Sequence, residues 1–234
     1  MKTFFKRVLY GGDYNPNQWP EDIWAEDMRL FKLAHINSAS INIFSWPKLQ
    51  PSENEYDFDE LDQIIEMLEK ENFDIVLATA TAAMPAWMFK NYPEVARVDY
   101  EGRRHRFGQR HNACPNSEIY KLYSKKLAGK LAERYGGGSN VACWHINNEY
   151  GGDCYCENCE KAFRVWLREK YGSTEALNRA WNMEFWGHLV YSWDEIVTPN
   201  ALTDGIGYDK TAFAGMSVDY RRFMSDSLLK NFVA

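Results

Sequence analysis

A short polar motif near the middle of the chain carries the residues best suited to acid/base chemistry. It spans residues 144–151, WHINNEYG, and follows an apolar stretch. A carboxylic acid held among aromatic side chains keeps its proton at higher pH, so it can protonate a poor leaving group in neutral solution. We predict that Glu149 is a general acid and that Asn148 offers its amide to a substrate hydroxyl. The alternative is a surface glutamate at the start of a helix.

A basic loop precedes this motif. Arg110 is expected to bind ligand oxygens and to neutralise a nearby carboxylate, because a guanidinium is a rigid fork with five donors. The other arginines of the loop are expected to face solvent. The histidines that could act as ligands or as acid/base groups are predicted to be hydrogen-bonded structural residues instead; these are His105, His111 and His145.

The cysteines suggest a metal site. Cys154, Cys156 and Cys159 lie just beyond the polar motif, and Cys114 could supply a fourth thiol from the preceding loop. Four thiolates complete the tetrahedral coordination of zinc and leave no position for water, so such a site would be structural. The alternative is a set of free buried thiols. Cys143, inside an apolar segment, is expected to be a small core residue.

Alternating strands and helices must position these groups. Four short apolar segments are predicted to be parallel strands covered on both faces, at residues 8–14, 38–44, 74–81 and 141–147. Amphipathic patterns predict helices at residues 21–35, 58–72, 117–135, 158–171 and 174–181, with a last one from about residue 217. Pro20 suits the first turn of the first helix, and Asp57 or Asp59 could cap the second.

This alternation is typical of an α/β fold, either an open doubly wound sheet or a (β/α)8 TIM barrel. Residues 10–16, YGGDYNP, lack the glycine spacing of a dinucleotide-binding turn, which disfavours the open sheet. No organic cofactor is expected. Polar and aromatic residues follow the carboxyl end of each strand, where a barrel carries its site. We predict that residues 1–234 are the N-terminal portion of one (β/α)8 domain, about four to five β/α units, truncated at the C-terminus.

Composition narrows the partners and the compartment. The 234 residues are 45% hydrophobic with a net charge of −6, as in soluble globular proteins. The 27 basic and 33 acidic residues form no long basic run, so nucleic acid is not an expected partner. No uninterrupted apolar stretch at the N-terminus is long enough for a signal peptide or a membrane span, and no membrane partner is expected. We expect a cytoplasmic protein whose cysteines stay as thiols.

Several motifs together resemble the family 42 glycoside hydrolases, the microbial β-galactosidases, over almost the whole chain. They are residues 10–20 (YGGDYNPNQWP), 44–46 (FSW), 85–87 (PAW), Arg110 with Cys114, and 147–151 (NNEYG). The resemblance implies a retaining enzyme that hydrolyses terminal β-D-galactosides, with Glu149 as the general acid/base and with Arg110 and Asn148 contacting galactose.

The resemblance also implies further features of the site and the assembly. Trp186, in the sequence FWG at 185–187, looks like the substrate-facing tryptophan of the family, although it could instead be a packed core aromatic. Some members carry zinc on cysteines that match those of this chain. The full enzyme is expected to be a homo-oligomer, a trimer.

A retaining glycosidase needs a second carboxylate, the nucleophile, about 5–5.5 Å from the first. In the resembling family this glutamate ends a later strand, beyond residue 234, and Glu184 and Glu195 match no nucleophile motif. We therefore expect the 234-residue chain alone to be inactive. Two alternatives stay open. One is a noncatalytic carbohydrate-binding or interaction module derived from such a barrel, and the other is a barrel glycosidase of another sugar specificity.

Overall fold

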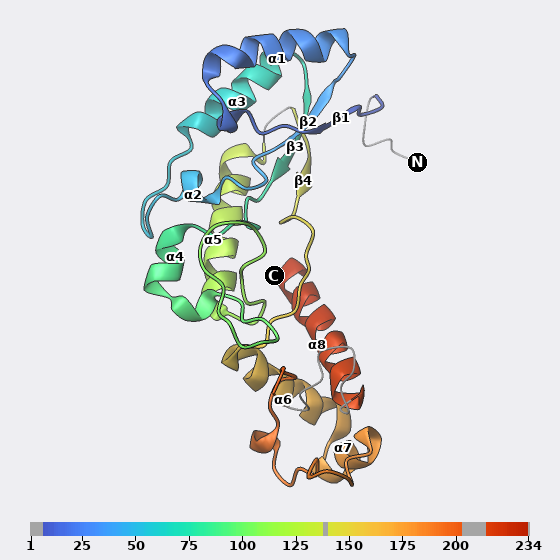
Figure 1. Ribbon diagram of the computed structural model, residues 1–234. Coiled ribbons are helices and arrows are strands. Elements are labelled where there is room, and N and C mark those ends of the chain that lie inside the picture. The colour runs from blue at the N-terminus through green and yellow to red at the C-terminus, as the bar shows by residue number, and fades with distance from the viewer. Residues whose placement is uncertain (1–6, 138–139, 203–213, 234) are drawn as a thin grey trace. The chain divides into compact units, whose positions relative to one another are not determined.

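The computed structural model describes residues 7–137, 140–202 and 214–233 (Figure 1). The chain divides into two compact units, described separately below. The first unit comprises Met1–Trp87 and Ser124–Glu149, and the second comprises Met88–Tyr123 and Tyr150–Ala234. Two helices contribute residues to both units, α4 (Ala86–Asn91) and α5 (Glu118–Tyr135).

The first unit contains a parallel four-stranded sheet. Its strands lie in the order β1 (Gly11–Asp13), β2 (Ser38–Ile41), β3 (Asp74–Ala78) and β4 (Val141–His145). Each strand therefore pairs with the next one along the chain, as in a barrel. A doubly wound sheet would instead reverse its order at a switch point. The sheet order thus favours the barrel over the open sheet.

The last three strands begin where the sequence predicts but end earlier. Asn42, Ala80 and Asn147 have φ angles of 67°, 62° and 58°, and each follows the end of its strand by one or two residues. Residues with a side chain rarely adopt this left-handed conformation, and a strand cannot continue through it. Irregular backbone therefore begins at the carboxyl edge of the sheet, where the polar residues gather.

The prediction that all four strands are buried on both faces is wrong for β1 and β4. The three residues of β1 are exposed and the five residues of β4 are only half-buried, whereas β2 and β3 are largely buried. The reason is that β1 and β4 form the two edges of the described sheet.

Gly11 marks a close approach between β1 and β2, since a Cβ atom there would lie 1.8 Å from the carbonyl oxygen of Ser38.

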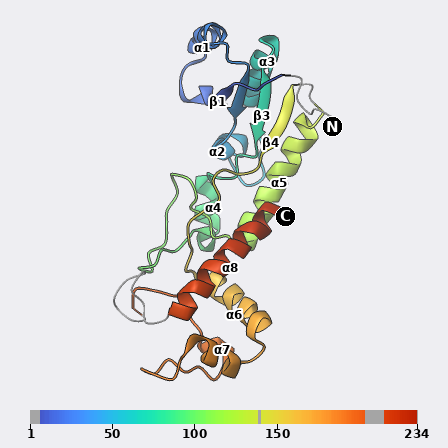
Figure 2. The same ribbon diagram turned by 90° about the vertical axis from the view of Figure 1, so that its right-hand side faces the viewer.

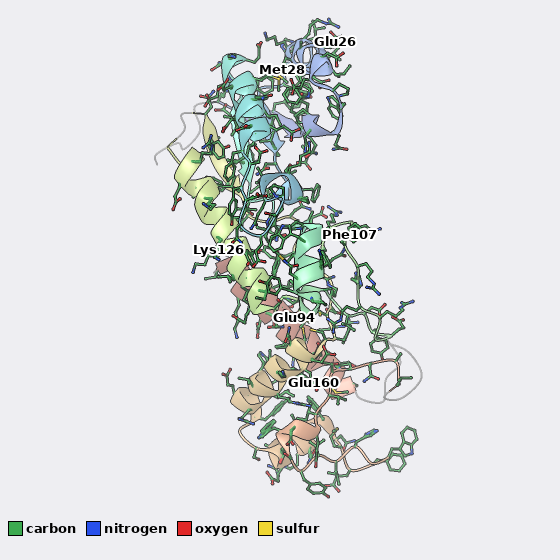
Figure 3. The ribbon with its side chains drawn as sticks, turned by 90° about the vertical axis from the view of Figure 1, so that its left-hand side faces the viewer. Glu26, Met28, Glu94, Phe107, Lys126 and Glu160 are labelled. Atoms are coloured by element: carbon green, nitrogen blue, oxygen red, sulfur yellow. The ribbon has the colours of Figure 1, made fainter. Side chains whose placement is uncertain are left out.

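Helical segments connect the strands of the first unit, namely η1 (Pro16–Gln18), α1 (Glu21–Leu33), α2 (Trp46–Leu49) and α3 (Asp59–Lys70). Met28 and Glu26 on α1 show its two faces (Figure 3), because Met28 is buried and Glu26 is exposed and paired with Arg29. At the start of α3 the carboxylate of Asp57 accepts a hydrogen bond from the backbone N–H of Asp59, at 3.0 Å. Phe58 occupies the N-cap position, so the prediction that Asp57 or Asp59 is the N-cap residue is wrong.

The second unit is mainly helical in its described part (Figure 2). Its elements besides α4 and α5 are η2 (Pro93–Val95), α6 (Glu157–Tyr171), α7 (Thr174–Trp181), η3 (Trp193–Glu195) and α8 (Ala214–Val233). The bounds of α7 are those predicted, α6 begins one residue earlier and α8 begins before residue 217. Aromatic side chains of α6, α7 and α8 pack with four buried cysteines in one core. No helix among the described residues is both long and apolar enough to cross a membrane.

One buried carboxylate ties α6, α7 and α8 together. Asp219 on α8 is 2% exposed and accepts hydrogen bonds from Lys170 Nζ, from Tyr171 OH at 2.6 Å and from Trp181 Nε1 at 3.1 Å. Burial alone would raise the pKa of Asp219, but these three donors lower it further than burial raises it, so the pKa lies below its usual value. The ionised form is therefore the one that this unit stabilises.

Candidate active site and metal centre

A buried polar network closes the carboxyl edge of β3 and β4. The backbone N–H of Asn147 donates to Thr79 Oγ1 at 2.8 Å, and its side-chain Nδ2 donates to Thr81 Oγ1 at 3.1 Å. The two threonine hydroxyls are 3.1 Å apart, and either can be the donor. All three side chains are buried. The network therefore holds Asn147 in its left-handed conformation, which by itself is unfavourable.

This anchored residue directly precedes the predicted site residues Asn148 and Glu149. The backbone N–H of Asn148 donates to Asn147 Oδ1 at 2.6 Å. The Nδ2 group of Asn148 is buried but has no hydrogen-bond partner among the described residues. Since native proteins rarely leave such a donor unpaired, it is available to an oxygen atom of a ligand. Glu149 has a φ angle of 43°, so the strained backbone extends to this residue.

Glu149 is an exposed residue. It belongs to the first unit together with Asn148, whereas the predicted ligand-binding residues Arg110 and Trp186 belong to the second. The role of Glu149 as the acid stays a prediction. Next in the chain, Tyr150 has its pKa raised by burial, so its hydroxyl stays neutral at physiological pH.

Arg110 lies in an exposed loop with two left-handed neighbours, Gln109 and His111. Asn112 holds this loop, since its Nδ2 donates to the carbonyl oxygens of Arg106, at 3.0 Å, and of Gly108. His105 makes a side-chain hydrogen bond of 3.2 Å with Asn112 Oδ1, as expected of a structural histidine.

Trp186 is presented to solvent. Its side chain is 73% exposed, so the alternative of a packed core aromatic is wrong. The indole lies against Phe185, with ring centroids 4.9 Å apart, and near His188 at 6.4 Å. The residue has a φ angle of 51° and precedes Gly187, so a sharp local turn projects it. Such an aromatic face is suited to stacking on the apolar face of a ligand.

The four predicted metal ligands come together in the core of the second unit. The sulfur atoms of Cys114, Cys154, Cys156 and Cys159 all lie within 4.8 Å of one another, and each residue is buried. Cys114 Sγ is 3.4 Å from the sulfur atoms of both Cys156 and Cys159. Tetrahedral zinc with Zn–S bonds of about 2.3 Å needs sulfur atoms about 3.8 Å apart, within the range seen here. The cluster can hold a metal ion.

The thiols of this cluster share their protons unequally. Hydrogen bonds with Cys154, Cys156 and Cys159 raise the pKa of Cys114, whereas hydrogen bonds with Cys114 and the other two thiols lower the pKa of Cys156. Asn116 adds a donor from its Nδ2 to Cys159 Sγ, at 3.4 Å. The pKa of Cys159 is raised as well, so metal binding, which requires deprotonated sulfur, would displace protons from Cys114 and Cys159. Cys143 is half-buried in β4 and lies outside the cluster.

Sequence reasoning missed the residues that support both sites. Thr79 and Thr81 are two apart at the end of a strand, so their side chains could have been expected on one face with the polar edge. The local sequence carries no comparable signal for Arg97, a half-buried arginine close to the cysteine cluster, or for Asp219 within a helix.

Comparison with known proteins identifies the family. The model of a family described as β-galactosidase matches residues 13–234. Together with the sequential parallel sheet and the solved structures below, this match places the chain among the (β/α)8 glycoside hydrolases and confirms the predicted α/β fold, part of a TIM barrel. The chain belongs to glycoside hydrolase family 42, the β-galactosidases.

Individual relatives agree with this assignment. The chain is 58% identical over 232 residues to β-galactosidase LacZ of Lactobacillus acidophilus, covering 98% of this chain and 35% of that protein. It is 56% identical to β-galactosidase BgaP of Planococcus sp., covering 95% of this chain and 33% of that protein. A crystal structure of β-galactosidase from Bacillus circulans sp. alkalophilus superimposes with a TM-score of 0.93 at 60% identity, covering 97% of this chain and 34% of the other. The chain thus spans about a third of the length of these relatives.

Proposed function

We propose that this chain is the part of a retaining β-galactosidase that supplies the general acid/base. Family membership and the names of the relatives support the activity. The single observation that carries the assignment to this part of the chain is the buried network at the carboxyl edge of the sheet, which holds Asn147 and thereby sets the backbone at Asn148 and Glu149. Barrel enzymes place their catalytic groups at this edge.

In the proposed reaction Glu149 donates its proton to the oxygen that links the galactosyl group to the leaving group. A second carboxylate attacks the anomeric carbon as the bond to that oxygen breaks. This attack leaves the galactosyl group covalently bonded to the second carboxylate. Glu149 then takes a proton from water as the water attacks the anomeric carbon and displaces that carboxylate, which releases galactose with retained configuration. The unpaired Nδ2 group of Asn148 would donate to a galactose hydroxyl, with Arg110 as a further donor and Trp186 as a stacking face.

The second carboxylate defines a first test. A retaining mechanism needs it about 5–5.5 Å from the acid, and neither Glu184 nor Glu195 matches a nucleophile motif. Purified protein consisting of residues 1–234 is therefore expected not to hydrolyse nitrophenyl β-galactoside. Turnover that copurifies with this chain would contradict the assignment of the nucleophile to a segment outside these residues.

A chimaera tests the acid/base role directly. Residues 1–234 would replace the matching third of the Lactobacillus acidophilus β-galactosidase, with the remainder taken from that enzyme. Glu149→Gln in the chimaera is expected to lower kcat/KM on the order of 10²–10⁴-fold for β-galactosides with poor leaving groups. The loss should be much smaller for dinitrophenyl β-galactoside, because a good leaving group needs no proton.

Glu184→Gln provides the matched control, since Glu184 is an exposed glutamate of the same chain and is expected to leave both substrates unaffected. Equal losses on good and poor leaving groups in Glu149→Gln would contradict the acid/base role. An active chimaera that hydrolyses β-glucosides in preference to β-galactosides would favour another sugar specificity. A chimaera that is folded but inactive, and whose first 234 residues retain sugar binding, would favour the noncatalytic module.

We further propose that the cysteine cluster holds one structural zinc ion. Its support is the closed set of four sulfur ligands, which leaves no position for a reacting water. Protein purified without chelators is expected to contain close to one zinc per chain, and Cys156→Ser is expected to lose it. Purified protein whose thiols are intact but which contains no zinc would contradict this assignment.

Three broader properties belong to the same proposal. Four free buried thiols fit a reducing compartment, so we propose a cytoplasmic protein. We propose that residues 1–234 form the N-terminal portion of one barrel domain, and that the full enzyme is a homotrimer. Light scattering of the chimaera measures its oligomeric state, and a monomer would contradict the last point.

A further inference from the structure

A half-buried arginine, Arg97, lies beside the cysteine cluster. The backbone around Arg97 is bonded to both segments that carry cysteines, since Cys114 donates its N–H to the carbonyl oxygen of Val95 at 2.8 Å and Tyr155 donates to that of Val98 at 2.9 Å. The guanidinium donates from Nη2 to the carbonyl oxygen of Gly151 at 2.7 Å. Its Nε is buried without a hydrogen-bond partner among the described residues.

The guanidinium lies next to the two segments that carry the metal ligands. It bonds to Gly151, three residues before Cys154, and Val95, two residues before Arg97, bonds to the backbone N–H of Cys114. Burial lowers the pKa of Arg97. Arginine remains protonated in proteins even so. A permanent positive charge therefore lies beside the segments that carry the cysteine cluster.

The loop that leads to Cys154 is also shaped around this side chain. Gly152 has a φ angle of 78°, and a Cβ atom at this position would lie 1.8 Å from Arg97 Nη1. Only glycine provides both the backbone conformation and the space that the guanidinium takes. Gly152, two residues before Cys154, thus leaves room for the guanidinium of Arg97.

Charge explains why a cation is needed here. Four thiolates around a divalent metal carry a double negative charge, and a buried charge is costly unless it is paired. We propose that Arg97 is the counter-cation of the metal-loaded cysteine cluster and that it raises the affinity of the cluster for zinc. The proposal rests on the zinc site proposed above and assigns a role to a residue that is not itself a ligand.

The test is a competition titration of the 234-residue protein with Zn²⁺ and a chromogenic chelator. Arg97→Met removes the charge but keeps a long apolar stem, and it is expected to weaken zinc binding about 10- to 100-fold, as loss of groups around metal ligands commonly does. Arg97→Lys keeps the charge and should lose less. Arg103→Met is the matched control, because the Arg103 side chain is 75% exposed and its charge is screened by water; it should bind zinc like the unchanged protein.

Thermal unfolding with and without zinc separates charge compensation from simple packing. In chelator-treated protein the thiols can stay neutral, so Arg97→Met should lower Tm only with zinc bound. Equal lowering of Tm in both states, or equal loss of zinc affinity in Arg97→Met and Arg97→Lys, would overturn the counter-cation role. The role would also be overturned if folded Arg97→Met bound zinc with an affinity within threefold of that of the unchanged protein. If the unchanged protein binds no zinc, the metal site itself is wrong, which is a distinguishable result.

Discussion

The two compact units bury their polar groups in different ways. In the first unit the buried polar residues lie at the edge of a hydrogen-bonded sheet, and Thr79, Thr81 and Asn147 satisfy one another. In the second unit, four thiols and the carboxylate of Asp219 lie inside a helical core. The sheet spreads its stabilisation over many backbone bonds. The stability of the helical unit depends on the cysteine cluster and on Asp219. A single substitution at either of them should therefore lower stability more than one at the sheet.

Loss of the proposed zinc ion should give the largest difference between the units. Cys156→Ser, or chelation of the unchanged protein, is expected to loosen α6, α7 and α8 while β2 and β3 keep their protection. The reason is that structural zinc contributes about 10–16 kcal/mol of binding free energy in small domains, and that free energy is coupled to folding. Hydrogen exchange measured by mass spectrometry reports each segment separately.

Cys143→Ser is the control for this experiment, since it changes a cysteine that lies in β4 and outside the cluster. It should leave the second unit and its metal content unchanged. If Cys156→Ser and Cys143→Ser loosen both units to the same extent, the proposed contrast between them is wrong.

Removal of the buried carboxylate should have the next largest effect. Asp219→Ala is expected to lower the free energy of unfolding by about 2–3 kcal/mol, because it leaves the half-buried hydroxyl of Tyr171 and the buried indole N–H of Trp181 unpaired. Urea denaturation monitored by tryptophan fluorescence measures this change. Asp226→Ala is the control, since Asp226 is an exposed residue of the same helix that accepts one hydrogen bond from Trp166. If Asp226→Ala lowered the free energy of unfolding as much as Asp219→Ala, burial of the carboxylate would not be the reason for the effect.

The same carboxylate predicts a pH dependence. The folded-state pKa of Asp219 is lowered, so the folded state binds this proton less readily than the unfolded chain does. Its stabilisation is therefore complete above the unfolded pKa of about 3.9 and is lost as the pH falls through the folded value. Unfolding free energies of the unchanged protein and Asp219→Asn should converge below about pH 4. If the unfolding free energies of the two proteins differ by the same amount at every pH, Asp219 is not the source of the pH dependence.

The smallest effect should come from the polar edge of the sheet. Thr79→Val removes the acceptor of the Asn147 N–H, and it is expected to cost about 1–2 kcal/mol and to speed hydrogen exchange at residues 147–149. Thr198→Val makes the same substitution at a buried threonine of the second unit, whose hydroxyl donates to the carbonyl oxygen of Tyr155 at 3.3 Å. It should leave exchange at residues 147–149 unchanged. A similar response to both substitutions would show that the network does not anchor this turn.

Local periodicity predicted much of the fold. The starts of β2, β3 and β4, the bounds of α7 and the position of α3 follow from the spacing of apolar residues and from caps nearby in the sequence. The short helices α2 and α4 were missed, because four or six residues are too few to establish a helical period. The exposure of β1 and β4 could not be predicted either, since an edge strand differs from a central one only in its neighbours.

The candidate sites were also predicted only in part from the sequence. Cys154, Cys156 and Cys159 are close together in the sequence, and the order of segments alone allowed Cys114 to be proposed as their partner. Only the tertiary structure brings its sulfur into contact with theirs and leaves Cys143 outside the cluster. The amino-acid sequence thus determined the elements, the polar motif after β4 and the set of thiols, because these depend on neighbours along the chain. The roles of Arg97, Asp219 and Thr79 were decided by tertiary structure, because each depends on charges and hydrogen-bond partners that the chain supplies from distant segments.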